Sequence, residues 1–336
     1  MKKTMKLLFV ILPLLIGYGY FTLKNNMFDG NVFTNKSEES LDDREAKKYT
    51  SLKIRICKAV EHEALNAVVK GMRDYLSKQQ GKEYDISIET CQGNMAMAAQ
   101  IISKFASSGA DIVVTVGTSP SQCAFPLARS GKIRLVFSSV TNPGDISPNL
   151  TNSNTVGVSN FVPLEPQLEL FRKIQPKLKN LGIIYNTGEA NSASIIKKLR
   201  PICKKIGIRL MEQGIMKVSD IPQAAEKLAK IVDAVFISND NTTLSGIPNI
   251  VTICSKYRIP VYVSDTDQVE KGCVAALGPN QYDIGVQTGK IIQRIADGYD
   301  INEMRVEYPD VTELYLNEKG PVKIPDDIKH KAKKIF

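Results

Sequence analysis

From residue 53 onward the chain repeats one pattern of hydrophobic and polar positions: a short apolar run, a polar loop, and a segment with helical periodicity. Residues 53–59 form the first apolar run. Residues 63–80 follow, with Leu65, Val68 and Met72 on one helical face. Residues 111–116 are rich in β-branched side chains, which is typical of a strand buried on both faces of a parallel sheet. The repeated unit predicts an α/β fold with parallel sheets and right-handed crossovers.

The same pattern predicts the remaining elements along the chain. Strands are expected at residues 86–90, 133–137, 181–185, 208–213, 234–238, 261–263, 273–277, 306–308 and 314–317. A helix is expected to end at residue 105, and others lie at 121–130, 165–175, 192–206, 221–231, 246–257 and 282–297.

Three stretches rich in Pro, Gly and Asn interrupt this rhythm, at residues 141–160, at 278–280 and at Pro309. Three chain crossings between two sheets predict a two-lobed clamshell in which each lobe is a parallel sheet flanked by helices. The expected boundaries place residues 53–140 and 279–308 in the first lobe, and residues 141–278 and 309–336 in the second.

The N-terminal segment has the layout of an export signal. Lys2, Lys3 and Lys6 precede an apolar run at residues 7–23. No small-x-small cleavage site follows cleanly, and the run is near the lower length limit for a membrane span. Residues 1–24 are therefore expected to be a signal peptide or a membrane anchor, and residues 25–52 a flexible linker. The basic flank predicts that everything after it is periplasmic or otherwise outside the cytoplasm.

Composition narrows the class of protein. A hydrophobic content of 43% and a charged content of 24% are typical of a soluble globular chain. The net charge of +9 comes from Lys and Arg spread over helix faces and the C-terminal end, without interleaved aromatic residues, so no nucleic-acid partner is expected. Six cysteines could form three disulfides, but their wide spacing within apolar segments favours buried free thiols. Without a CxxC motif, and with two His, no metal site is expected.

Candidate site residues follow the predicted strands. Ligands of open α/β sheets bind just beyond the carboxyl ends of the strands, so the polar side chains there predict a pocket for a small polar molecule. No obvious nucleophile–base pair is present, which favours binding over catalysis and requires no cofactor. The candidates are His62, Thr118, Ser119, Ser139, Thr141, Glu189, Asn191, Ser192, Asp240, Asn241 and Asp265.

Most of these groups have a structural alternative. Thr118 and Ser119 open a helix, where a hydroxyl serves either as an N-cap or as part of a site for an α-carboxylate. Glu189 begins a capping sequence, yet its carboxylate could also meet an α-ammonium group. Asp240 and Asp265 could do the same or merely shape turns. His62 could line the pocket or cap a helix.

Seven motifs resemble those of type I periplasmic binding proteins of ABC importers, and more narrowly the substrate-binding family that includes tryptophan and other aromatic amino-acid binders. They lie at residues 60–65, 117–120, 137–143, 157–159, 184–192, 238–242 and 264–265. The resemblance spans roughly residues 54–325. Glu63 stands where the family often has Pro, and Asn142 where Asp is common.

The resemblance implies an exported, monomeric solute-binding protein that captures a small zwitterion between its lobes. The expected ligand is an amino acid, with aromatic amino acids among the candidates, and the expected partner is an ABC permease in the membrane. Lobe closure would couple ligand capture to delivery. The alternative is a sensor component or an enzyme on the same scaffold.

Overall fold

The computed structural model describes residues 51–336, so the predicted signal or anchor at 1–24 and almost all of the linker at 25–52 lie outside the described residues. The fold is α/β and two-lobed, built on two sheets of five and seven strands. Hydrophobic cores lie on both faces of each sheet, as the apolar strand sequences predict.

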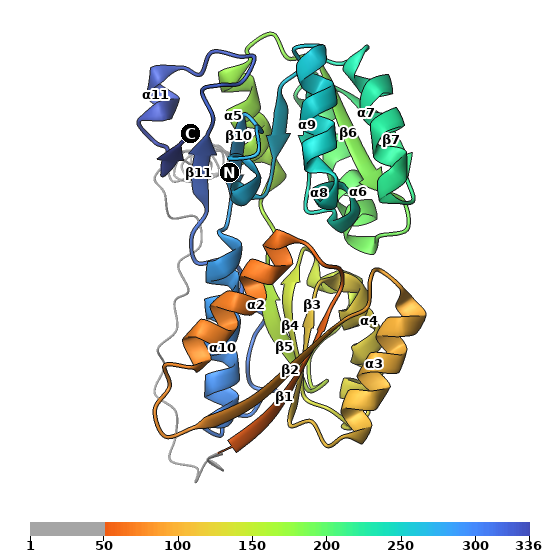
Figure 1. Ribbon diagram of the computed structural model, residues 1–336, viewed down its shortest axis with the longest axis vertical. Helices are drawn as coiled ribbons and strands as arrows, with labels where there is room; N and C mark the ends of the chain where they lie inside the picture. The colour runs from red at the N-terminus through yellow and green to blue at the C-terminus, as the bar shows by residue number, and fades with distance from the viewer. Residues whose placement is uncertain (1–50) are drawn as a thin grey trace, which may run out of the picture. The chain divides into compact units, whose positions relative to one another are not determined.

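The first lobe is built on five parallel strands in the order β2-β1-β3-β4-β5. They are β1 (Ser51–Lys58), β2 (Glu83–Thr90), β3 (Ile112–Val116), β4 (Leu135–Val140) and β5 (Thr155–Ser159). One face carries α3 (Met95–Ser107) and α4 (Thr118–Arg129). The other carries α2 (Glu63–Leu76) and α10 (Gln281–Ala296), which lie side by side (Figure 1).

Glycines let α2 and α10 approach until their backbones touch. A Cβ atom added to Gly71 would lie 2.0 Å from the carbonyl oxygen of Tyr282, and one added to Gly285 would lie 1.9 Å from that of Val68. This close packing brings α10 into the hydrophobic core of the first lobe, although it follows the second lobe in the sequence.

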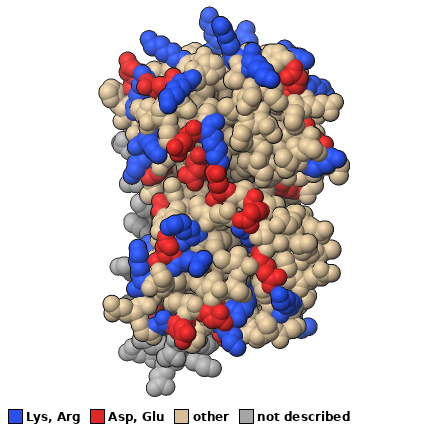
Figure 2. Space-filling model, viewed as in Figure 1, with Lys and Arg blue, Asp and Glu red and all other residues tan. Residues whose placement is uncertain are grey.

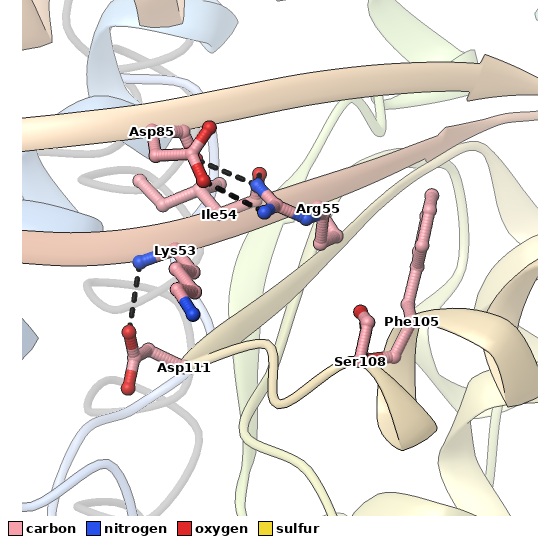
Figure 3. Close-up of polar contacts among 7 residues, drawn as sticks. All are labelled: Lys53, Ile54, Arg55, Asp85, Phe105, Ser108 and Asp111. Atoms are coloured by element: carbon pink, nitrogen blue, oxygen red, sulfur yellow. Dashed lines mark hydrogen bonds and ion pairs between the residues drawn. The ribbon is translucent and has the colours of Figure 1, made fainter.

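Polar contacts fix the register at the amino ends of the first sheet (Figure 3). The guanidinium of Arg55 in β1 forms an ion pair of 2.7 Å with Asp85 in β2 and also donates to the Asp85 carbonyl oxygen. The Lys53 backbone N–H donates to the carboxylate of Asp111, just before β3, at 2.8 Å. A one-residue slip would break both contacts and turn the apolar faces outward.

The second lobe has seven strands in the order β12-β11-β10-β9-β8-β6-β7. They are β6 (Asn180–Asn186), β7 (Arg209–Ile215), β8 (Ala234–Ile237), β9 (Val261–Val263), β10 (Ala275–Gly278), β11 (Glu313–Leu316) and β12 (Lys334–Ile335). Only the β10–β11 pair is antiparallel. Helices α5 (Leu164–Ile174) and α6 (Ala190–Lys205) share one core, and α7 (Ile221–Ala229) and α9 (Ile247–Lys256) share the other. Two short helices are α8 (Asn241–Ser245) and α11 (Asp326–Lys329).

Both lobes use the same strand order. Numbered along each lobe, the parallel strands run 2-1-3-4-5, and the connections reverse direction between the first and third strands. Such a reversal leaves an open crevice at the carboxyl ends of those two strands, which is where α/β sheets bind ligands. The crevices lie after β1 and β3 in the first lobe and after β6 and β8 in the second.

The structure differs from the sequence prediction in four places. Residues 155–159, expected within a crossing to the second lobe, form β5 and pair with β4, so the chain leaves the first sheet after Ser159 and not at residue 141. The strand expected at 306–308 is a single bridge between Glu307 and Val158. The helix expected at 246–257 is preceded by the separate helix α8, and α4 begins at Thr118, three residues before its predicted start.

Five of the six cysteines are buried, Cys123 is half-buried, and no disulfide joins them.

Candidate functional site

A small polar cavity lies between the strand ends of the two lobes. The first lobe and its exit contribute His62, Ala64, Leu65, Thr118, Ser139, Thr141, Asn160 and Gln281, and the second contributes Asn191, Asn239, Asn241 and Leu244. The remaining volume is about 10 Å³, roughly the room that one water molecule needs. The lining side chains therefore fill most of the space between the lobes.

On the first lobe, three lining residues stand where helices begin. His62 is the N-cap of α2, and its Nδ1 atom accepts from the Leu65 N–H at 3.4 Å. Thr118 is the first residue of α4 and Gln281 the first of α10. The N-cap of α4, Gly117, provides no side-chain acceptor, and the buried Thr118 hydroxyl makes no hydrogen bond within residues 51–336. The start of α4 thus keeps free donors beside the cavity.

Ser139 shows local backbone strain at the floor of the cavity. It lies in β4 with a φ of 54°, at a register shift between β4 and β5. Bulges of this kind redirect side chains next to functional sites. The Ser139 hydroxyl donates to Gln281 Oε1 at 3.2 Å and accepts from Asn160 Nδ2 at 2.8 Å, while Thr141 donates to Asn160 Oδ1 at 3.0 Å. One polar network therefore connects β4 with two of the chain crossings.

On the second lobe, the Glu189 carboxylate caps α8 from the end of β6. It accepts from the backbone N–H groups of Asn241 and Thr242 at 3.1 and 3.0 Å and from Asn241 Nδ2 at 2.7 Å. Because the amide nitrogen of Asn241 faces Glu189, its Oδ1 atom faces the first lobe, 3.4 Å from His62 Nε2. Since His62 Nδ1 accepts from a backbone N–H, its Nε2 carries the proton and donates to Asn241. Burial lowers the pKa of His62, which favours this neutral form.

Two buried aspartates support the same strand ends. The Asp240 carboxylate accepts from the Asn186 N–H, the Ser192 hydroxyl and the Thr243 N–H at 2.6 to 2.8 Å. Burial, reinforced by the nearby Glu189 carboxylate, raises the pKa of Asp240 to about 6.

Asp265 is equally buried, and it accepts from the Asp267 N–H and from Gln268 Nε2 at 3.1 and 3.0 Å. Burial raises the pKa of Asp265 to about 6 as well.

The structure divides the predicted site residues into two groups. Those that line the cavity are His62, Thr118, Ser139, Thr141, Asn191 and Asn241; those that do not are Ser119, Glu189, Ser192, Asp240 and Asp265. The second group includes every carboxylate, because each carboxylate accepts hydrogen bonds from strand-end and helix-start groups of its own lobe. Polar lining residues absent from the prediction are Asn160, Asn239 and Gln281, and the apolar ones are Ala64, Leu65 and Leu244.

The electrostatic character of the cavity comes from dipoles. Helices α2, α4, α6, α8 and α10 all have their amino ends at cavity-lining residues, so their positive ends gather there. No Asp, Glu, Lys or Arg is among the lining residues in the described part of the chain. On the face shown in Figure 2, Lys and Arg are interspersed with Asp and Glu over both lobes. A small molecule carrying a carboxylate and no net charge fits such a cavity.

Two sheets of one strand order, with a polar cavity between their strand ends, define a two-lobed solute-binding protein of the type I periplasmic binding fold. The chain belongs to the family of ABC transporter substrate binding proteins, whose family model matches residues 53–335. Within residues 51–336, no helix is long and apolar enough to span a bilayer.

Relatives with described ligands bind aromatic amino acids. A tyrosine-binding protein from Clostridioides difficile (strain R20291) is 27% identical over 325 residues, covering 95% of this chain and 92% of the relative. A domain from Streptococcus pneumonia, solved in complex with L-Trp, is 25% identical with a TM-score of 0.80, covering 85% of this chain and 100% of that one. A conserved domain protein from Vibrio cholerae is 30% identical with a TM-score of 0.80, covering 85% and 99%.

A further comparison concerns the arrangement of the lobes. A ligand-free, open structure of a substrate binding protein from Clostridium difficile is 29% identical but has a TM-score of only 0.64, covering 84% of this chain and 98% of that one. The structure thus fits the L-Trp complex better than the open form, despite the lower sequence identity to the former. Together with the small cavity, this difference indicates that the lobes are closed.

Proposed function

We propose that this chain is an extracytoplasmic amino-acid-binding protein of an ABC importer. Its ligand is a zwitterionic amino acid with an uncharged, preferably aromatic, side chain. The observation that carries this proposal is the cavity itself: neutral hydroxyl and amide groups from both lobes, at the amino ends of five helices. The tyrosine-binding relative and the L-Trp complex support the aromatic preference.

The α-carboxylate would bind at the start of α4. The free N–H groups of its first turn and the Thr118 hydroxyl provide donors, and the helix dipole favours a negative group there. A charge-assisted hydrogen bond from Thr118 would contribute about 1.5–3 kcal/mol.

The α-ammonium group would be met by neutral oxygen atoms. Asn241 Oδ1 faces the cavity because Glu189 holds the amide nitrogen on the other side. Glu189 thereby acts as a positioning residue for Asn241. Its negative charge, one layer behind the cavity, also stabilises a cation in front of it.

The ligand side chain would lie against Leu65 and Leu244, the larger apolar groups of the lining. An aromatic amino acid is much larger than the remaining 10 Å³, so its entry requires the lobes to separate and the His62–Asn241 contact to break. Closure around the ligand would then replace that contact with contacts from both lobes to the ligand.

Delivery follows from the family. We propose that the closed, liganded form docks on a membrane permease outside the cytoplasm and releases the amino acid for import. The predicted signal at residues 1–24 supports this location.

Titration calorimetry on the refolded chain, freed of ligand by unfolding, tests the binding proposal. We expect tyrosine, tryptophan or phenylalanine to bind, and glutamate and lysine to bind far more weakly. Thr118→Val should weaken binding about 10- to 100-fold. The matched control Thr252→Val changes an exposed threonine of α9 and should leave affinity unchanged. No heat from any amino acid, or equal affinities in the two variants, would refute the site assignment.

A further inference from the structure

Two polar contacts join the lobes outside the cavity. In the first, the Ser194 hydroxyl of α6 donates to Asp145 Oδ1 at 2.6 Å. Asp145 belongs to the first lobe: it ends the 3₁₀ turn Pro143–Asp145 after β4, and its carbonyl oxygen accepts from Gln122 of α4 at 2.7 Å. Asn142 Nδ2 donates to the same carboxylate oxygen at 2.8 Å and lies 3.4 Å from the Ser194 hydroxyl.

The second contact is an ion pair between Glu63 and Lys271. Glu63 is the first residue of α2 in the first lobe, and Lys271 lies between β9 and β10 in the second. The Glu63 side chain is 72% exposed and that of Lys271 is 29% exposed, so water reaches the pair.

Neither contact involves a residue that lines the cavity. They therefore differ from the His62–Asn241 contact, which occupies the ligand space and must break when a ligand enters. The two outer contacts can form whenever the lobes are closed, with or without a ligand between them.

We propose that Asp145–Ser194 and Glu63–Lys271 are interlobe latches that stabilise the closed arrangement and set affinity without touching the ligand. The effect on the free protein is independent of what the protein binds, whereas the effect on affinity rests on the proposed function. A contact made only in the closed state multiplies the closing equilibrium constant by one factor for every ligand. Losing a latch therefore weakens all ligands equally, while losing a lining group changes selectivity.

The strength of each latch follows from its surroundings. The Asp145–Ser194 bond involves a charged acceptor, but Asp145 Oδ2 is buried without a hydrogen-bond partner within the described chain, which opposes closure. We therefore expect Ser194→Ala to lower affinity about tenfold, the weak end of the range for such bonds. The exposed ion pair is screened, so Lys271→Glu should cost only a few-fold.

Small-angle X-ray scattering on the free, refolded protein tests the latches directly. Ser194→Ala and Lys271→Glu should each increase the radius of gyration relative to the wild type. Ser255→Ala is the matched control, because Ser255 is an exposed helical serine whose hydroxyl bonds only within α9. Combining Lys271→Glu with Glu63→Lys should restore the wild-type value, since the ion pair forms again with reversed charges.

An unchanged radius of gyration in both single variants overturns the proposal. A change in one of them confines the latch to that contact and removes the other. Calorimetry adds a second criterion: the affinity loss in Ser194→Ala must be the same factor for every amino acid that binds, and unequal factors overturn the affinity role. If no amino acid binds, the proposed function fails, while scattering still decides whether the latches exist.

Discussion

Replacing Asp265 by Asn should stabilise the protein at neutral pH. Asp265 is fully buried, and its ionised form receives only two hydrogen bonds, from Asp267 and Gln268. The Gln268 Oε1 atom is also buried without a partner in the described chain. In Asp265→Asn, the Gln268 amide can rotate so that Oε1 accepts from the new amide nitrogen, while the backbone donor of Asp267 keeps its acceptor. The variant removes a buried charge and satisfies an orphaned oxygen.

The size of the effect follows from the pKa. Burial raises the pKa of Asp265 from 3.8 to about 6 in the folded protein. Between these values the folded state binds more protons than the unfolded state, so the free energy of unfolding falls as pH rises from 3.8 to about 6. By pH 7 the ionised group costs about 3 kcal/mol. The stability of Asp265→Asn relative to wild type should therefore increase by about that amount between pH 4 and pH 7.

Urea unfolding followed by circular dichroism at pH 4, 5, 6 and 7 measures this difference. Asp240→Asn is an informative comparison, because burial raises the pKa of Asp240 to the same value, about 6. Both oxygens of Asp240 accept backbone N–H groups, so an amide nitrogen would face a donor, and this variant should be less stable at every pH. A pH-independent difference for Asp265→Asn would refute the reasoning. A large loss of ligand affinity in that variant would instead show that Asp265 contacts the ligand.

Two further substitutions test how the fold holds the site. Ser139→Val places a β-branched residue at a φ of 54° and should destabilise the protein by about 1–3 kcal/mol relative to Ser139→Gly, which tolerates that backbone and equally lacks the hydroxyl. Equal urea midpoints for the two variants would remove the argument from strain. Gly285→Ala places a methyl group 1.9 Å from the Val68 carbonyl oxygen, so we expect α2 and α10 to separate at a cost of about 1–3 kcal/mol or more. A thermal unfolding midpoint like that of wild type would contradict the contact.

Strand positions were predictable because buried parallel strands are continuous apolar runs. The resemblance and the three breaks also predicted the two-lobed fold correctly. The error at β5 arose because its five residues follow a stretch of Asn, Ser and Pro that favours a loop. That error hid Asn160, a polar residue directly after a strand, which the rule used for the other candidates would have found.

The carboxylates show the limit of reading a site from strand ends. Glu189 and Asp240 follow β6 and β8, as predicted, but neither lines the cavity. Glu189 caps a helix that begins 52 residues later in the chain, and Asp240 accepts from an N–H group 54 residues earlier. Such partners depend on how neighbouring strands are placed, and local sequence patterns do not contain that information. Hydroxyl and amide residues at the same loops, including Thr118 and Asn191, were predicted to bind ligand and do line the cavity.

The position of α10 has a consequence for how the chain folds. Its apolar residues, with Ile301, complete the same core that receives Leu52, Ile54 and Ile56 of β1, yet the whole second lobe except its last strands is made in between. During synthesis, the second-lobe strands β6 to β10 are complete before α10 exists, while the first lobe lacks one of its two covering helices. Closing a loop of roughly 200 residues between α2 and α10 carries a large entropic cost and slows folding. The amino-terminal lobe is therefore the last to finish, and a chain ending before Gln281 would leave that side of its sheet exposed.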